Sequence, residues 1–128
     1  MNYTTNVGER GIATEDTDRL IASDKVEGTA VFDRNGKHLG RVHHLMIDKY
    51  SGQVVYAIAS FGGFFGIGEN WISLPWKALN YEPRVGGYVV NVDRAKLERA
   101  PNFRSTEPPD WSDRTYNEEI EQYWYPGV

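Results

Sequence analysis

The chain has 128 residues and carries 14 Lys and Arg against 18 Asp and Glu, for a formal net charge of -4. This is the length of one domain, and the absence of cysteine excludes a disulfide scaffold, a thiolate metal site and a cysteine nucleophile. The mildly acidic balance argues against nonspecific binding to a phosphate backbone, which needs a surplus of basic residues. The 4 Trp, 8 Tyr and 5 Phe make up 13% of the chain, which is more than a single modest core requires.

The net charge is confined to the C-terminal end. Residues 1–103 hold 12 acidic and 12 basic side chains, whereas residues 104–128 hold six acidic and two basic ones. Residues 1–18 are polar and lack the apolar run of a signal peptide, so we expect a disordered leader and a cytoplasmic protein. The uncharged stretch 50–68 contains five glycines, most of them near its end, which favours a buried strand and a loop over a membrane span.

Runs of β-branched and aromatic residues between turn residues predict a small all-β domain. The Asn35-Gly36 pair is the strongest short hairpin signal and predicts a turn between the first two strands. In the second strand the apolar residues break their period of two once, which predicts a β-bulge near His43 and His44. The run at 53–61 is apolar at both parities, which is typical of a central strand covered on both faces. The six predicted strands span residues 26–33, 38–49, 53–61, 70–76, 78–81 and 88–92.

Two helices are predicted near the C-terminal end. Asp93 can cap a helix over residues 94–100, which Pro101 prevents from continuing. After a linker rich in Ser and Pro, Ser112 can cap a second helix over residues 113–124. One face of this helix carries apolar side chains at i, i+4, i+7 and i+8 spacing: Tyr116, Ile120, Tyr123 and Trp124.

The glycine-rich segment 63–68 lacks the essential parts of a phosphate-binding loop. Such a loop needs a Lys and a Ser or Thr before a helix N-terminus, whereas Glu69 and a predicted strand follow here. We therefore expect the segment to connect two strands. Its side chains Phe64, Phe65 and Ile67 cannot all turn inward, so we expect an apolar contact surface at its tip.

No catalytic or metal-binding constellation is apparent in the sequence. His43 and His44 are adjacent and would point to opposite faces of a regular strand, and His38 would lie about 20 Å from His44 at strand rise. Acidic residues are scattered over turns, and no Ser-His-Asp arrangement can be assigned. We therefore expect no enzyme activity, no cofactor and no bound metal, and we interpret the histidines as polar strand residues at a bulge.

An ordered series of motifs resembles the PRC-barrel domain, which occurs in the photosynthetic reaction-centre H subunit and in a ribosome maturation factor. The most specific segment is 56–68, and the hairpin at 35–42 carries the Gly-x-x-Leu-Gly-x-Val pattern. Further matching motifs lie at 20–24, 45–48, 51–54, 75–79 and 97–103. The resemblance implies a small β-barrel that binds or assembles with other proteins rather than an enzyme.

We therefore expect a small antiparallel PRC-type β-barrel of about six strands, with a short helix after the last strand and a helix in the tail. The predicted organisation is a disordered leader at 1–18, a barrel at 19–103 and an acidic aromatic tail at 104–128. The sequence shows neither the transmembrane helix of the H subunit nor an RNA-handling domain before the barrel. We expect a stand-alone member of the family.

The predicted function is that of a non-catalytic interaction or assembly module, which binds a protein partner and associates with itself as a homodimer. Burial of two or three aromatic rings would stabilise such a contact by several kcal/mol, at roughly 25 cal/mol per Å². The predicted interface residues are Phe64, Phe65, Ile67, Trp71, Trp111, Tyr123, Trp124 and Tyr125. Two alternatives stay open: an RNA- or ribosome-associated assembly factor, although the balanced charge disfavours nucleic acid, and a binder of a small ligand in the barrel interior.

Overall fold

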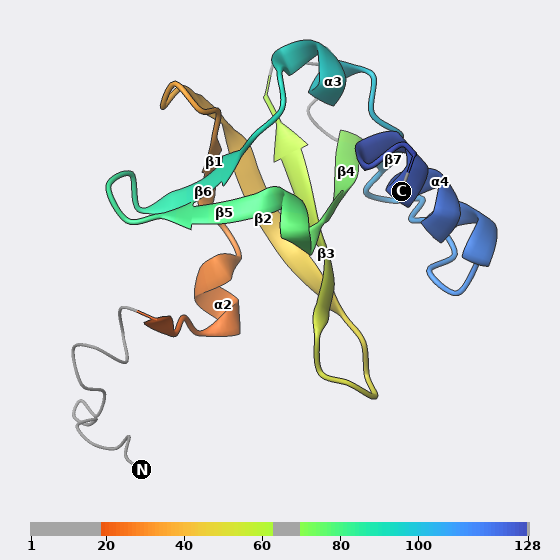
Figure 1. Ribbon diagram of the computed structural model, residues 1–128. Coiled ribbons are helices and arrows are strands. Elements are labelled where there is room, and N and C mark those ends of the chain that lie inside the picture. Colours follow the sequence, from red (N-terminus) through yellow and green to blue (C-terminus); the bar gives the residue numbers. More distant parts are fainter. Residues whose placement is uncertain (1–18, 63–69, 128) are drawn as a thin grey trace.

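The computed structural model describes residues 19–62 and 70–127, in which strands predominate (Figure 1). The strands are β1 (Ala30–Phe32), β2 (His38–Ile47), β3 (Val54–Phe61), β4 (Asn70–Pro75), β5 (Leu79–Glu82), β6 (Gly87–Val90) and β7 (Asn102–Arg104). The helical elements are α2 (Ser23–Val26), the 3₁₀ helix η1 (Trp76–Ala78), α3 (Arg94–Glu98) and α4 (Arg114–Trp124). The predicted leader at 1–18 and the predicted loop surface at 63–68 lie outside the described residues.

The strands form one mixed sheet in the order β5-β6-β1-β2-β3-β4-β7, which corrects the expected antiparallel barrel of about six strands. β1 pairs in parallel with β6, and the other pairs are antiparallel. In the described part of the chain the sheet is not closed into a barrel, because β7 occupies the outer edge of β4 and β5 ends the other side. The parallel pair joins segments that are far apart in the chain, and β7 has only three residues. Neither feature could therefore be recognised from a local sequence pattern.

The first hairpin confirms the turn predicted from the Asn-Gly pair. Asp33 Oδ1 accepts hydrogen bonds from the backbone N–H groups of Asn35 at 2.8 Å and Lys37 at 2.9 Å. Gly36 has φ of +85°, the left-handed conformation that glycine adopts without strain. β1 is shorter than the predicted strand at 26–33, because the chain before it forms the short helix α2, which the sequence pattern did not indicate.

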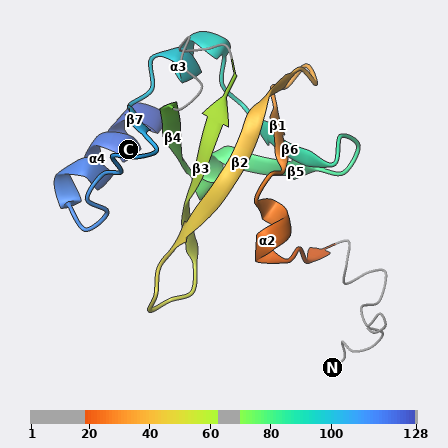
Figure 2. The same ribbon diagram turned by 180° about the vertical axis from the view of Figure 1, so that it is seen from behind.

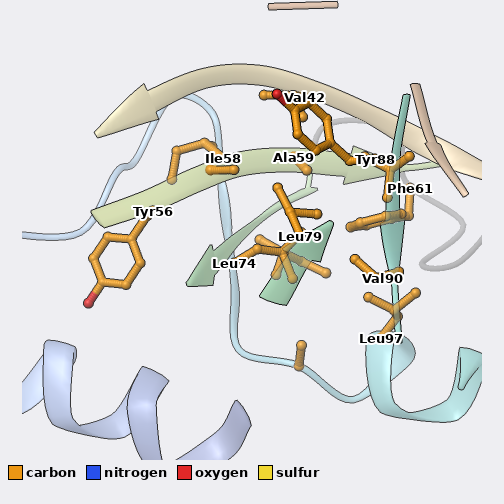
Figure 3. Close-up of a cluster of buried hydrophobic side chains, with 14 of the residues drawn as sticks. Val42, Tyr56, Ile58, Ala59, Phe61, Leu74, Leu79, Tyr88, Val90 and Leu97 are labelled. Atoms are coloured by element: carbon orange, nitrogen blue, oxygen red, sulfur yellow. The ribbon is translucent and has the colours of Figure 1, made fainter. Parts of the chain in front are cut away.

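The inner face of the sheet carries the main core. Residues paired across neighbouring strands share a face, so Val42, Ala59 and Ile72 lie together on it. Figure 3 shows the buried side chains gathered there, among them Val42, Ala59, Phe61, Leu74, Leu79, Tyr88, Val90 and Leu97. On β3 both faces are covered, since the residues from Tyr56 to Ala59 are all buried. The prediction of a doubly covered central strand is confirmed.

The two helices after β6 begin with aspartate caps. The Asp93 side chain accepts from the backbone N–H of Lys96, as predicted for the start of α3. α4 is capped by Asp113, which accepts from the N–H of Thr115, and not by Ser112. The Ser112 hydroxyl instead donates to Asp110 in the preceding turn. Figures 1 and 2 show α4 lying beside β4 and β7, on the side of the sheet away from β5 and β6.

Candidate interaction surface

A series of aromatic rings crosses the outer face of the sheet, from β4 to the start of α4. Trp71 meets Phe103 of β7 edge-on, with ring centroids 6.4 Å apart. Phe103 in turn lies 5.8 Å from Trp111, and Trp111 lies 5.9 Å from Tyr116. All four rings are partly buried and pack against the core. The series continues onto β2, and its members, called the aromatic band below, are His43, His44, Trp71, Phe103, Trp111 and Tyr116.

Both histidines of the band contact the same indole ring. His43 stacks on Trp71 with centroids 4.2 Å apart and an interplanar angle of 16°. His44 meets Trp71 edge-on at 5.6 Å. Neighbours in a regular strand point to opposite faces, but the register of β2 shifts between Val42 and His44, so both rings reach Trp71. The bulge prediction is confirmed, and the expectation that the two histidines diverge is wrong because of that bulge.

His43 is held in place by a hydrogen bond across the β2–β3 pair. Its Nε2 lies 2.7 Å from Ser60 Oγ. Burial lowers the pKa of His43 below its ordinary value, and repulsion from the Arg41 guanidinium and the neighbouring His44 ring lowers it further. At neutral pH the imidazole is therefore uncharged, and it stacks on Trp71 as a flat, half-buried ring.

Two hydroxyl hydrogen bonds fix α4 against the outer face. The hydroxyls of Tyr116 and Ser73 lie 2.7 Å apart, which gives the fully buried Ser73 a partner. Tyr56 points away from the inner core toward α4 (Figure 3), and its hydroxyl donates to Asn117 Oδ1 at 2.5 Å. Burial, helped by Tyr116 and Glu121, raises the pKa of Tyr56 to about 12. The aromatic tail is thus docked on the sheet of its own chain.

Lysine side chains hold the C-terminal end of α4. Lys96 Nζ donates to the carbonyl of Tyr123 at 2.6 Å and lies 4.4 Å from the centroid of that ring. The Tyr123 hydroxyl donates to the carbonyl of Lys96 in return. Lys77 Nζ lies 3.3 Å from Glu121 Oε1 and 4.3 Å from the centroid of Tyr125. Because Lys77 and Glu121 are half exposed, their ion pair adds little, and the anchoring comes from the hydrogen bonds between Lys96 and Tyr123 together with the ring contacts.

The structure separates the predicted interface residues. Trp71 and Trp111 belong to the aromatic band and are partly exposed. Tyr123 and Tyr125 are partly buried where the lysines hold the tail, and Trp124 is buried in the core with 6% of its surface exposed. The remaining three, Phe64, Phe65 and Ile67, lie outside the described residues.

Four members of the aromatic band were not among the predicted interface residues, and one of them, Tyr116, was assigned only to the apolar face of the tail helix. His43 and His44 were interpreted as unremarkable strand residues, although the predicted bulge already implied that two consecutive side chains could share a face. Phe103 was assigned to the end of the barrel, whereas it lies in β7 opposite Trp71. An edge strand of three residues is too short for its alternation to be recognised.

The remaining chemistry of the described residues is modest. No group of three or more His, Cys, Asp or Glu side chains within 19–62 and 70–127 lies close enough to hold a metal ion. One hollow of about 270 Å³ opens between the β1–β2 turn and α3, and another of about 250 Å³ opens beside η1 and the end of α4. The inner side of the sheet is filled by aliphatic side chains, including Val31, Ile72 and Leu74 at 0% exposure. This filling argues against a ligand inside the sheet.

These features define a small, mostly β domain with an aromatic outer surface. A family model for the PRC-barrel domain matches residues 18–97, which is more than half of the chain. The chain therefore belongs to the PRC-barrel domain family, as its motifs predicted. Domains of this family are generally non-catalytic. The matched residues end before β7 and α4, so Phe103, Trp111 and Tyr116 of the aromatic band come from the segment that follows.

No curated protein matches the chain. In the part of the chain that the structure describes, no helix is both long enough and apolar enough to cross a membrane.

Proposed function

We propose that this protein is a non-catalytic interaction and assembly module that associates with itself through the aromatic band. The observation that carries the proposal is the state of Trp71. Its indole contacts His43, His44 and Phe103, yet it is only partly buried. A ring that is fixed by its neighbours and still open to solvent loses little conformational freedom when a partner covers it.

The composition around Trp71 supports the same proposal. The centres of protein interfaces are enriched in Trp, Tyr, Phe, Met and Arg. Besides the band itself, the outer face of β2 carries Met46, which is paired with Tyr56, and the exposed Arg41, which is paired with Ser60. A partner seated there would cover aromatic, thioether and guanidinium groups together.

The predicted interface residues do not all belong to the proposed contact surface. Phe64, Phe65 and Ile67 remain part of it on the evidence of the sequence, since their segment joins the end of β3 to the start of β4, close in sequence to Trp71. Trp111 and Tyr116 of the tail belong to the aromatic band, whereas Trp124 near its end is buried in the core. Trp124 is therefore not offered to the partner.

Sedimentation velocity over a range of protein concentrations tests the proposal. We expect the intact chain to form a dimer, and we expect Trp71→Ala or the double change Phe64→Ser with Phe65→Ser to shift it toward monomer. Tyr81→Ser, at an exposed position on β5, is the matched control and should leave the dimer intact. Circular dichroism of each variant shows whether the fold is kept.

The proposal would be contradicted if the intact chain sediments as a monomer at every concentration and cross-linking yields neither a dimer nor a complex with another protein. Co-purified nucleic acid that salt releases would instead support the RNA-associated alternative, because backbone contacts weaken as ionic strength rises.

A further inference from the structure

The exposed apolar side chains of the described residues are unevenly distributed. Seven large apolar side chains are exposed: Leu20, Ile21, Ile47, Tyr50, Val55, Tyr81 and Val85. The first two immediately precede α2, and the next three lie on the β2–β3 hairpin around its turn. Figures 1 and 2 show α2 and the hairpin turn toward the same end of the molecule, whereas the β5–β6 hairpin, with Tyr81 and Val85, projects to the side. Five of the seven therefore belong to one end, called the apolar end below.

Hydrogen bonds in the β2–β3 turn fix the backbone around Tyr50. Asp48 Oδ1 accepts hydrogen bonds from the N–H groups of Tyr50 at 2.8 Å and Ser51 at 3.2 Å. The Asp48 carbonyl accepts from Gly52 N–H at 2.8 Å, and Asp48 N–H donates to the carbonyl of Gln53 at 2.8 Å. The Tyr50 side chain is nevertheless 99% exposed. A pinned backbone thus presents a free phenol ring at the tip.

Two exposed aliphatic side chains lie on the strands that lead into and out of this turn. Ile47 pairs with Val54, and the register shifts between Met46 and Ile47, so that Val55 is the extra residue of a bulge. At a bulge two residues of one strand oppose a single residue of the other. Ile47 is 49% exposed and Val55 is 43% exposed. The turn therefore combines one amphipathic ring with a small aliphatic base.

The second part of the apolar end is also anchored to the fold. Leu20 and Ile21 are 62% and 48% exposed, and they lead into α2, whose Val26 is buried at 3%. Just after α2, Gly28 N–H donates to the carbonyl of Val42 on β2 at 2.6 Å. Both parts of the apolar end are therefore fixed to the same strand.

The shape of this end decides what can cover it. The hairpin projects beyond the rest of the sheet (Figure 1), so its apolar groups are convex. The hairpin's aromatic ring and two half-exposed aliphatic side chains bury a few hundred Å² at most, on the order of 150–250 Å² for the ring, which is below the roughly 800 Å² that each partner contributes to a standard protein interface. Leu20 and Ile21 lie on a separate segment before α2. A soft surface that yields around separate convex groups suits them better than a second copy of the chain.

We propose that the apolar end inserts into the interfacial region of a lipid bilayer. Tyrosine is enriched at the level of the lipid headgroups, because its ring is apolar and its hydroxyl is polar. Aliphatic side chains at the same end would reach the upper acyl region, as in proteins that lie on a membrane without spanning it. The proposal concerns a different surface from the aromatic band and does not depend on self-association.

The charges of this end set the expected lipid preference. Arg19, Lys25 and Lys49 are exposed there, and they are balanced by three exposed acidic residues, Asp24, Glu27 and Asp48. Binding would therefore be driven by apolar transfer and not by attraction to anionic lipid. Such binding depends only weakly on salt, in contrast to binding by a basic patch.

Co-sedimentation of the full chain with vesicles tests the proposal. We expect binding to phosphatidylcholine vesicles, little change when phosphatidylglycerol is added, and little change with salt. The triple variant Ile47→Ser, Tyr50→Ser, Val55→Ser should lower the partition coefficient about tenfold or more, because it removes all three exposed apolar side chains of the hairpin and leaves only Leu20 and Ile21 to insert. The matched control, Tyr81→Ser with Val85→Ser, removes exposed apolar groups elsewhere and should bind as the intact chain does.

Failure of the intact chain to bind either kind of vesicle would overturn the proposal, as would equal binding by the triple variant. Binding that requires phosphatidylglycerol and disappears in salt would assign the attraction to charge instead. If the triple variant keeps its fold but loses a concentration-dependent dimer, the hairpin is a protein contact, and the lipid assignment is wrong.

Discussion

The two faces of the central sheet are packed by different chemistry. On the inner face, aliphatic side chains such as Val42, Ile72 and Leu74 are fully buried and pack through van der Waals contacts. On the outer face, α4 is held by rings and by hydroxyl hydrogen bonds at Ser73 and Tyr56, and the adjoining aromatic band stays partly open. We expect the inner face to supply most of the free energy of folding, whereas the aromatic band on the outer face leaves a surface that a partner can cover.

The largest expected effect lies on the inner face. Leu74→Ala removes a side chain with 0% exposure and leaves a cavity, so we expect the free energy of unfolding to fall by about 3 kcal/mol. Val55→Ala on the neighbouring strand is the control, because its side chain is 43% exposed and its loss should matter far less. Urea denaturation measures both. Equal losses would mean that the inner face does not dominate stability.

A backbone contact between β2 and β3 sharpens the same comparison. A Cβ added at Gly40 would lie 1.9 Å from the Ser60 carbonyl oxygen and 2.9 Å from Phe61 Cα, so the strands must separate. We expect Gly40→Ala to lower the free energy of unfolding by about 2 kcal/mol. Gly62→Ala is the matched control, since a Cβ at Gly62 meets nothing within 4 Å. Thermal melting of the two variants should differ clearly, and matching melting temperatures would refute the close approach.

The hydroxyl contacts of the outer face should contribute less. Tyr116→Phe leaves the buried Ser73 hydroxyl without its partner, and we expect a loss of about 1 kcal/mol in the free energy of unfolding. Tyr81→Phe removes a hydroxyl from a half-exposed ring and serves as the control, with no measurable change expected. A loss at Tyr116 as large as that of Leu74→Ala would remove the distinction between the faces.

The smallest expected effect is a pH dependence of the aromatic band. The pKa of His43 is lower in the folded chain than in the unfolded one, so the unfolded state binds the proton first as the pH falls. Stability is therefore complete above the ordinary histidine pKa and declines below it, and the decline is small because the ring is only partly buried. Denaturation measured at several pH values from about 7.5 down to about 5.5 should show this decline in the free energy of unfolding. The variant His43→Gln should show a smaller decline. An unchanged slope in that variant would assign the dependence to other groups.

Local patterns were sufficient to predict much of the inner framework. The Asn35-Gly36 turn, the bulge near His43, the doubly covered β3 and the Asp93 cap each depend on neighbours in sequence, and each is found in the structure. The mixed sheet was not predicted, because the parallel pairing of Val31 with Tyr88 brings together residues far apart in the chain.

The candidate surface was only partly predictable for the same reason. Trp71 and Trp111 were predicted as interface residues because the chain holds more aromatic residues than a single core requires. That Trp71 meets both histidines and Phe103 depends on the bulge and on the β4–β7 pairing, which only the folded chain shows. Likewise, the burial of Trp124 in the core follows from the docking of α4 on its own sheet.

Hydrogen exchange measured by mass spectrometry at low and high protein concentration tests the proposed self-association through the aromatic band most directly. If Trp71 and the two histidines form the contact, peptides from β2 and β4 should gain protection as the protein associates, while peptides from α4 keep the protection they already have. Unchanged exchange in β2 and β4 in a sample that sediments as a dimer would contradict the proposed surface. A change confined to α4 would instead indicate that the tail is exchanged between copies.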